Sequence, residues 1–336
     1  MTQSQAIEAE VVVFAPLPVA TVTIEEQGQD ADIHFHAGSQ GVWQARMLVT
    51  LGASVTMCCV LAGESGVVLR RLLEDEGIRV HAVEGAGRNG AYVHDRRSGE
   101  RVEIAMAPAT PLSRHELDEL FGLTLSAALD AGAVVLSGPF DYPMEHDAVP
   151  PDAYRRLTSD LRAIDRPTVV DLAGDRLTAV LAGGPTVVKI SHEELSDDGL
   201  ADDTNIDSLV EAMRALRDDG AENVIVTRAE GSTLILSNGI VREVTVPQLQ
   251  AAETRGAGDS LTAGVAAVLA TGGSIDEAVR MGAAAGMLNV TRHGLGTGEV
   301  GAVLRLRELV SVTELGDDER SVTVSPEQLA DRAEEP

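Results

Sequence analysis

The chain has 336 residues, and its 53 aspartates and glutamates against 26 lysines and arginines give a formal net charge of −27. This balance argues against nucleic acid and anionic membranes as partners, because both require a basic surface. Hydrophobic residues make up 44% of the chain and aromatic residues only 2%, so the length suffices for one large domain or two smaller ones with an aliphatic core.

Nothing in the sequence indicates export or insertion into a membrane. No apolar run approaches the ~20 residues that cross a bilayer, and Met1–Glu10 lacks the basic start and apolar block of a signal peptide. The two cysteines, Cys58 and Cys59, are neighbours in an apolar run and are expected to be buried free thiols. We therefore expect a cytoplasmic protein.

Apolar, β-branched runs alternate with segments of helical period along most of the chain. This alternation predicts βαβ units, and hence an α/β fold with a mostly parallel sheet and helices on both of its faces. In chain order, strands are predicted at 11–14, 55–61, 133–137, 168–172, 186–190, 224–227, 233–236 and 240–246. Helices are predicted at 41–51, 66–76, 114–120, 154–163, 207–218, 259–270 and 275–289.

Two stretches interrupt this alternation, at about 19–36 and 88–106. Both have polar alternation typical of extended chain and no helix within them, so they predict a small β-sheet that projects from the main domain as a lid. Residues 316–336 are acidic and have no clear apolar face, and we expect this tail to be loosely ordered.

The segment richest in chemistry is Glu253–Ser260, with the sequence E-T-R-G-A-G-D-S, which leads into a helical run. Two glycines around an alanine allow a tight turn, and the unpaired amides at the start of the following helix can bind an anion such as a phosphoryl group. Asp259 falls in the first helical turn, where it can accept a proton from a hydroxyl. A glycine-rich turn with an ordinary helix-start Asp explains the same segment equally well.

The surroundings of this segment resemble the ribokinase-like family of carbohydrate kinases, of phosphofructokinase B type, over about residues 11–310. The segment itself is similar to the G-A-G-D motif of that family, and Lys189–Leu195 resembles its K-P-N-x-x-E-L motif. Three further segments resemble parts of the family. Ala37–Gly52 is similar to its G-G-K-G-x-N-x-A-R-x-L region, and Thr227–Gly231 is similar to its nucleotide loop. Ala283–Thr297 resembles the segment that borders the adenine pocket. The branch with 1-phosphofructokinases and tagatose-6-phosphate kinases is the most similar.

The resemblance implies a ribokinase-like three-layer fold with a lid, a kinase domain over 11–310, and ATP and Mg²⁺ as co-substrate and metal. It implies that Asp259 is the base, with an anion hole formed by Gly256, Ala257 and Gly258. Glu194 would orient Mg²⁺ through water. The other nucleotide-binding residues it implies are Lys189, Ser191, Thr227, Ala229, Gly231 and Asn289. Two alternatives stay open. Glu193 and Glu194 are also consistent with a pair of acids favoured at a helix start rather than a metal site, and Asn289 with an ordinary polar helix position rather than the adenine pocket.

The acceptor side departs from the family. The G-G-K-G-x-N region reads G-S-Q-G-V-W over Gly38–Trp43, without the Lys and the Asn. The N-P-A-L-D region reads A-P-L-P-V over Ala15–Val19, without the carboxylate. The candidate acceptor-binding residues are therefore Gly38, Ser39, Gln40, Gly41 and Arg88.

Arg88 belongs to the densest basic stretch of the chain, which also holds His94, Arg96, Arg97 and Arg101. Arginine matches the geometry of phosphate, so this stretch favours a phosphorylated acceptor, although a charged hairpin is an alternative.

We expect an ATP-dependent kinase of a sugar or sugar phosphate, with a fructose phosphate-like acceptor favoured and a homodimer formed through the lid. A kinase of a nucleoside or other unphosphorylated polyol, and a catalytically weak nucleotide- or sugar-phosphate-binding protein, are the alternatives.

Overall fold

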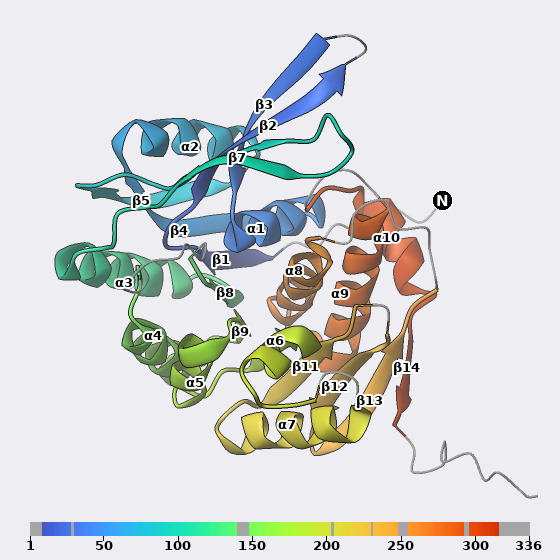
Figure 1. Ribbon diagram of the computed structural model, residues 1–336. Coiled ribbons are helices and arrows are strands. Elements are labelled where there is room, and N and C mark those ends of the chain that lie inside the picture. The colour runs from blue at the N-terminus through green and yellow to red at the C-terminus, as the bar shows by residue number, and fades with distance from the viewer. Residues whose placement is uncertain are drawn as a thin grey trace, which may run out of the picture.

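The structure is a computed structural model, which describes residues 9–27, 30–139, 148–202, 205–229, 231–247, 255–291 and 296–315 (Figure 1). The predicted tail at 316–336 lies outside the described residues, as do Glu253 and Thr254 of the G-A-G-D segment.

A ten-stranded sheet forms the centre of the molecule, in the order β14-β13-β12-β11-β10-β9-β8-β1-β4-β5. The strands from β11 through β5 in this order are parallel to their neighbours, and β12, β13 and β14 form an antiparallel edge. The mostly parallel sheet is therefore confirmed. The strands are β1 (Glu10–Phe14), β4 (Ser54–Ala62), β5 (Arg79–Gly85), β8 (Ala133–Ser137), β9 (Thr168–Asp171), β10 (Val187–Ser191), β11 (Asn223–Thr227), β12 (Thr233–Ser237), β13 (Ile240–Thr245) and β14 (Ser311–Glu314).

Helices cover both faces of the sheet, which confirms the three layers (Figure 1). Side chains of α1, α2, α8, α9 and α10 pack on one face, and side chains of α3, α4, α5, α6 and α7 pack on the other. The helices are α1 (Gln40–Thr50), α2 (Gly63–Asp75), α3 (Arg114–Ala128), α4 (Pro151–Ala163), α5 (Gly174–Leu181), α6 (His192–Asp197), α7 (Ile206–Asp218), α8 (Ala257–Leu269), α9 (Ile275–Val290) and α10 (Val300–Arg307).

The central strands are the best predicted elements because they are apolar on both sides, as strands of a parallel sheet between two helical layers must be. All five residues of β8 are buried, and its bounds agree with the predicted 133–137. The edge strands β5 and β14 were not predicted, since most of their residues are at least partly exposed and give no apolar run. Helix α3 continues to Ala128 although prediction ended it at Leu120, because Gly122 lies inside it.

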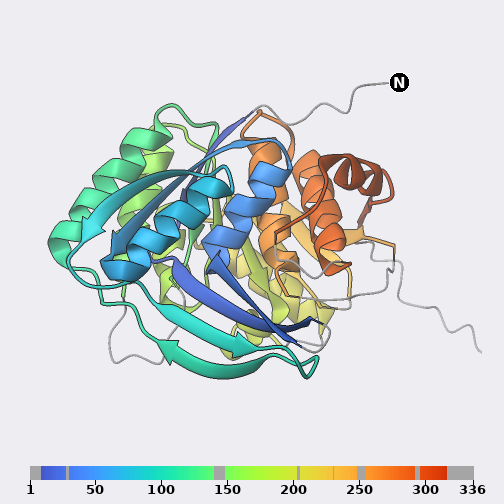
Figure 2. The same ribbon diagram turned by 90° about the horizontal axis from the view of Figure 1, so that it is seen from above.

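The lid is a separate four-stranded sheet in the order β3-β2-β6-β7. It consists of β2 (Val19–Gln27), β3 (Asp30–Gly38), β6 (Ala91–Asp95) and β7 (Val102–Ala107). Figure 2 shows these strands along one side of the molecule, beside α1 and α2. The prediction of a small separate sheet is thus confirmed, with two of its strands at 19–38 and two at 91–107.

Both cysteines are free and buried, as predicted. Burial, as the largest cause, raises the pKa of Cys58 to about 11, so its thiol stays protonated at neutral pH. Within the described residues, we find no helix of the length and apolar character that a membrane span requires.

Candidate active site

The G-A-G-D segment forms a tight turn at the start of α8. Gly256 is the residue before the helix and has φ 77°, a left-handed conformation that glycine adopts without steric cost. The backbone N–H of Ser260 donates to the carbonyl of Gly256 at 2.9 Å. The helix begins at Ala257, two residues earlier than predicted. The first amides of α8 therefore have no partner within the helix and can bind an anion.

Close packing against α9 holds this turn in place. A Cβ atom at Gly286 of α9 would lie 2.9 Å from the carbonyl oxygen of Ala257, and one at Gly282 would lie 2.6 Å from that of Leu261. Asn289 adds two hydrogen bonds: its Nδ2 donates to the carbonyl of Arg255 at 2.7 Å, and its Oδ1 accepts from the N–H of Gly296 at 2.9 Å. Asn289 thus holds the turn before α8 in place through these two bonds. Its role beside an adenine pocket stays a prediction.

Asp259 is a buried carboxylate in a network that joins four elements of the main domain, α1, β9, β10 and α8. Gln44 of α1 reaches both acids of this network, with its Nε2 3.0 Å from Oδ2 of Asp171 and 3.4 Å from Oδ1 of Asp259. Lys189 of β10 lies 3.1 Å from Oδ1 of Asp171, and Thr262 donates to Oδ2 at 2.8 Å. Asp171 therefore accepts three bonds in this network, whereas Asp259 accepts only the long bond from Gln44 among these contacts.

The electrostatics of the network favour a proton on Asp259. Burial and then the negative charge of Asp171 raise the pKa of Asp259 to about 8, against the opposing charge of Lys189. Burial alone would lower the pKa of Lys189, but Asp171, Glu194 and Asp259 outweigh it and raise that pKa above the usual range. Lys189 is thus charged at neutral pH, and Asp259 is a stronger base than an ordinary carboxylate.

Asp171, Gln44 and Ser137 were missed by the sequence analysis. Asp171 ends β9, and the hydroxyl of Ser137 at the end of β8 donates to Oε1 of Gln44. A polar residue at the carboxyl end of a parallel strand is the signal that could have found both strand residues, because ligands bind at that edge of such sheets. The sequence carries no corresponding signal for Gln44, which lies within a helix.

Except for Asn289 on α9, the predicted nucleotide-binding residues lie at or just beyond the carboxyl ends of β10 and β11. Lys189 borders the first turn of α8, since a Cβ atom at Gly258 would lie 2.8 Å from its Nζ. Ser191 and Thr227 are directly opposite each other in the parallel pairing of β10 and β11. Gly231 closes a turn beyond β11, where its N–H donates to the carbonyl of Arg228 at 2.9 Å. Ala229 lies within this turn.

Ser191 and Glu194 form a capping box at the start of α6. The N–H of Ser191 donates to Oε2 of Glu194 at 2.7 Å, and the N–H of Glu194 donates to Oγ of Ser191 at 3.1 Å. This agrees with the helix-start alternative for Glu194. It does not remove Glu194 from the site, because its charge is still close enough to raise the pKa of Lys189 and of Asp259.

The predicted acceptor-binding residues Gly38–Gly41 lead into α1 beside the ends of β1 and β8. A Cβ atom at Gly41 would lie 2.5 Å from that of Ala15, and Oε1 of Gln40 accepts from the N–H of Gly138 at 3.2 Å. Ser39, which replaces a glycine of the family motif, has φ 113° and ψ 162°. This region of backbone conformation is almost exclusive to glycine.

We expect Ser39→Gly to raise the free energy of unfolding by ~1 kcal/mol. Relief of a strained backbone is worth roughly 1–3 kcal/mol, and the greater freedom of glycine in the unfolded chain offsets part of it. Urea denaturation of the two proteins measures the difference. Ser65→Gly in the first turn of α2 is the control and should destabilise, because its backbone is helical. Equal losses for both variants would show that Ser39 is unstrained.

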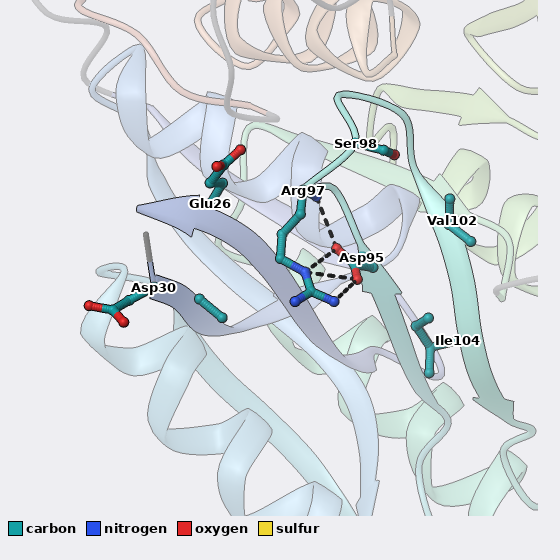
Figure 3. A pocket seen from close by; sticks show the side chains of 8 residues that line it. Glu26, Asp30, Asp95, Arg97, Ser98, Val102 and Ile104 are labelled. Atoms are coloured by element: carbon teal, nitrogen blue, oxygen red, sulfur yellow. Dashed lines mark hydrogen bonds and ion pairs between the residues drawn. The ribbon is translucent and has the colours of Figure 1, made fainter. Parts of the chain in front are cut away.

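The basic stretch of the sequence is divided among different surfaces. Arg88 lies on an exposed loop between β5 and β6, where its Nε donates to the carbonyl of Pro108 at 3.3 Å. Arg97 pairs with Asp95 at the tip of the lid, through its Nε at 3.0 Å from both carboxylate oxygens (Figure 3). His94 is buried on the inner face of the lid. The five residues therefore do not form one surface.

Comparison with known proteins identifies relatives over most of the chain. Residues 12–300 match the pfkB family of carbohydrate kinases. An ATP-dependent 6-phosphofructokinase isozyme 2 of Escherichia coli is 30% identical over 77% of this chain and 83% of its own length. A 1-phosphofructokinase of Bacillus subtilis is 25% identical over 83% and 89%. The tetrameric inhibited form of phosphofructokinase-2 from Escherichia coli superimposes with a TM-score of 0.75 and 25% identity, covering 89% of this chain and 98% of its own.

Proposed function

The chain belongs to the pfkB family of carbohydrate kinases, and on that premise we propose that it transfers the γ-phosphate of ATP to a hydroxyl of a fructose phosphate-like sugar phosphate. The observation that carries the proposal is the position of Asp259. Its carboxylate is buried in the first turn of α8, directly after a glycine turn whose amides are free to bind an anion. A base and an anion site are thus adjacent, as phosphoryl transfer requires.

In the proposed reaction, the acceptor hydroxyl lies against Asp259 and loses its proton to that carboxylate as its oxygen attacks the γ-phosphorus. The bond from phosphorus to the β-γ bridging oxygen breaks, and ADP leaves with that oxygen. The amides of Gly256, Ala257 and Gly258 stabilise the charge on the transferring group, together with the ammonium of Lys189. Ser191, Thr227, Ala229, Gly231 and Asn289 are proposed to lie around the nucleotide.

The residues around Glu194 fit Mg²⁺ that arrives with the nucleotide. Mg²⁺ keeps several waters and is bound in such sites by one or two carboxylates together with substrate phosphates. Glu194 supplies a carboxylate beside the turn, and within the described part of the chain no three His, Cys, Asp or Glu side chains could hold an ion by themselves. Glu194 would hold the ion through water, and the ion would neutralise charge on the phosphates.

We expect Glu194→Gln to raise the Mg²⁺ concentration for half-maximal rate by ~10-fold, as loss of an indirect contact to a metal typically does. Glutamine also serves in a capping box, so α6 keeps its start and only the charge is removed. The measurement is a Mg²⁺ titration of the rate at saturating ATP and sugar phosphate. Glu116→Gln removes the corresponding charge from the capping box of α3 and is the control. An unchanged titration would restrict Glu194 to capping.

A panel of acceptors tests the function directly. Release of ADP should be measured with fructose 6-phosphate, fructose 1-phosphate and tagatose 6-phosphate, and with fructose, ribose and a nucleoside. The proposal is supported if one of the sugar phosphates gives a higher kcat/KM than every unphosphorylated acceptor in the panel. Turnover of an unphosphorylated acceptor alone would contradict it, and would favour Trp43 as a residue that stacks on the acceptor.

Arg88 is proposed as an exposed contact that attracts the phosphorylated acceptor to the site. We place the reaction in the cytoplasm, where ATP and sugar phosphates meet.

We further propose a homodimer formed through the lid. The outer face of the lid exposes Ile33, Phe35, Val102 and Ile104, at 55%, 63%, 46% and 58%. It also contains a hollow of about 550 Å³ between the β2–β3 hairpin and the β6–β7 hairpin (Figure 3). Apolar surface of this kind on an otherwise acidic protein marks a site of association.

Phe35→Asp should convert the dimer into a monomer, because each copy of a symmetric interface would bury the introduced carboxylate. Sedimentation equilibrium at micromolar concentration measures the change. Val67→Asp on α2, at a residue that is 74% exposed, is the control and should leave the mass unchanged. A wild-type monomer under the same conditions would disprove the lid dimer.

A further inference from the structure

The inner face of the lid carries basic side chains that the proposed reaction does not use. Thr23 of β2 lies between two histidines, with its Oγ1 3.1 Å from Nε2 of His94 and 3.4 Å from Nε2 of His36. Thr21, Thr23 and His94 are all buried, and the lid packs on α1 and α2. This face of the lid is therefore turned toward the main domain.

Two arginines complete the group, which we call the lid cluster: His36, His94, Arg101 and Arg255. The guanidinium of Arg101 stacks 4.8 Å above the ring of Tyr92, whose centroid lies 5.2 Å from that of His94. Arg255 comes directly before Gly256. Burial is the largest cause that lowers the pKa of both Arg101 and His94, and the positive charge of Arg255 adds to the lowering in each case. The cluster thus joins the lid to the anion-binding turn at the start of α8.

The charges that act on the cluster are positive. Burial lowers the pKa of both histidines most, to about 4 in each case. The charged groups that lower them further are Arg46, Arg101 and His34 for His36, and Arg101, His36, Arg96 and Arg255 for His94. Within the described residues, Nδ1 of His94 and Nε of Arg101 are buried without a hydrogen-bond partner. Two arginines beside buried ring and guanidinium nitrogens that have no partner, in a chain of charge −27, indicate that an anion belongs there.

We propose that the lid cluster is an anion site that holds the phosphate of the acceptor, an inference that rests on the function proposed above. The planar guanidinium groups of Arg101 and Arg255 match phosphate geometry. An anion beside His36 and His94 favours their charged forms, so the site takes up a proton when phosphate binds. By linkage, its affinity for an anion then rises as pH falls. Arg88 lies apart from the cluster, on the loop between β5 and β6, where its Nε donates to the carbonyl of Pro108.

Sulfate is a suitable probe, because it stays a dianion between pH 6 and pH 8 and any pH dependence then comes from the protein. We expect calorimetric titration to give ~3–10-fold tighter sulfate binding at pH 6 than at pH 8, with net proton uptake measured in buffers of different ionisation enthalpy. The double variant His36→Gln, His94→Gln should lose this pH dependence. Arg255 lies in a turn, so its substitution disturbs folding less than a substitution in the buried face of the lid. Arg255→Gln should weaken sulfate binding ~10–100-fold at both pH values.

Exposed residues elsewhere provide matched controls. His81→Gln on β5 and Arg71→Gln on α2, where Arg71 pairs with Asp75, should change neither the affinity nor its pH dependence. Thermal unfolding of every variant confirms that it is folded. Sulfate affinity that is independent of pH in the wild type, or equal in Arg255→Gln and Arg71→Gln, would overturn the site.

Steady-state kinetics then identify which phosphate the cluster holds. Arg255→Gln should raise KM for the sugar phosphate ~10-fold or more, with KM for ATP changed less than about twofold. A rise in KM for ATP alone would assign the cluster to the nucleotide and overturn the inference. If the variant uses the sugar phosphate as well as the wild type does, and only Arg88→Ala raises KM, the inference is wrong and the proposed function stands. If the wild type does not phosphorylate any sugar phosphate, the proposed function itself fails.

Discussion

Asp259→Asn should fold normally and lose ~10²–10⁴-fold in kcat, the usual effect of removing a general base. Asparagine has nearly the same shape and still accepts the hydrogen bond from Gln44, but it cannot take the proton of the acceptor hydroxyl. The start of α8 does not depend on the carboxylate, because Gly256 precedes the helix and no side chain caps it. The expected loss is therefore in kcat, with KM for both substrates changed little.

The same substitution should stabilise the protein above neutral pH. The folded state holds the proton of Asp259 up to a pKa of about 8, whereas the unfolded chain releases it near 4. Between these values the folded state binds more protons, so stability falls as pH rises through this window. Asparagine at this position removes the cost of burying the ionised carboxylate, which should raise the free energy of unfolding by an amount on the order of 2 kcal/mol at pH 8.5 and less at pH 5.5. The gain stays this small because the charge is shared with Asp171 and Lys189.

Two measurements check this pair of expectations. Steady-state kinetics with the best acceptor give kcat, and urea denaturation at pH 5.5 and pH 8.5 gives the free energy of unfolding. Asp207→Asn is the control, because Asp207 is an exposed aspartate in the first turn of α7 and should change neither quantity. Wild-type kcat in Asp259→Asn would refute the assignment of the base. A loss of stability at pH 8.5 would show that the carboxylate contributes more to folding than its burial costs.

The parts of this fold that local patterns specify were predictable. The central strands are apolar on both sides, and the turn from Gly256 to Asp259 is specified by consecutive residues. Edge strands such as β5 were not, because half-exposed strands lose the apolar run that identifies them. The short helices α5, α6 and α10 were not predicted either; they have eight, six and eight residues and too few turns to show a helical period.

The site was predictable only where its residues lie together in the sequence. Gln44 and Asp259 are brought together by the packing of α1 on α8, and no spacing in the sequence records that contact. The lid cluster has the same origin, since His36, His94 and Arg255 come from three distant segments. The strain at Ser39 is visible only as a backbone angle, although the glycine of the family motif indicates where to look for it.

The ion pair of Lys189 and Asp171 gives the second large expected effect. Both side chains are almost wholly buried, at 8% and 1% exposed, and they lie 3.1 Å apart. Lys189→Met removes the only cation that the described structure places among Asp171, Asp259 and Glu194. Breaking a buried pair in this way typically costs ~3–5 kcal/mol, because the remaining charge is left uncompensated. We expect that loss at pH 8 and a smaller one at pH 5, where a proton can replace the lysine charge.

A double variant separates the structural role of Lys189 from its role in catalysis. In Asp171→Asn, Lys189→Met the buried charge and its partner are both removed, so much of the stability should return, because a neutral pair carries no desolvation cost. Activity should not return, since the ammonium beside Gly258 is still absent from the phosphate site. Urea denaturation of the wild type, both single variants and the double variant gives the coupling energy between the two residues. Additive losses would show that the two side chains do not stabilise each other, and recovery of activity with stability would show that Lys189 serves only the fold.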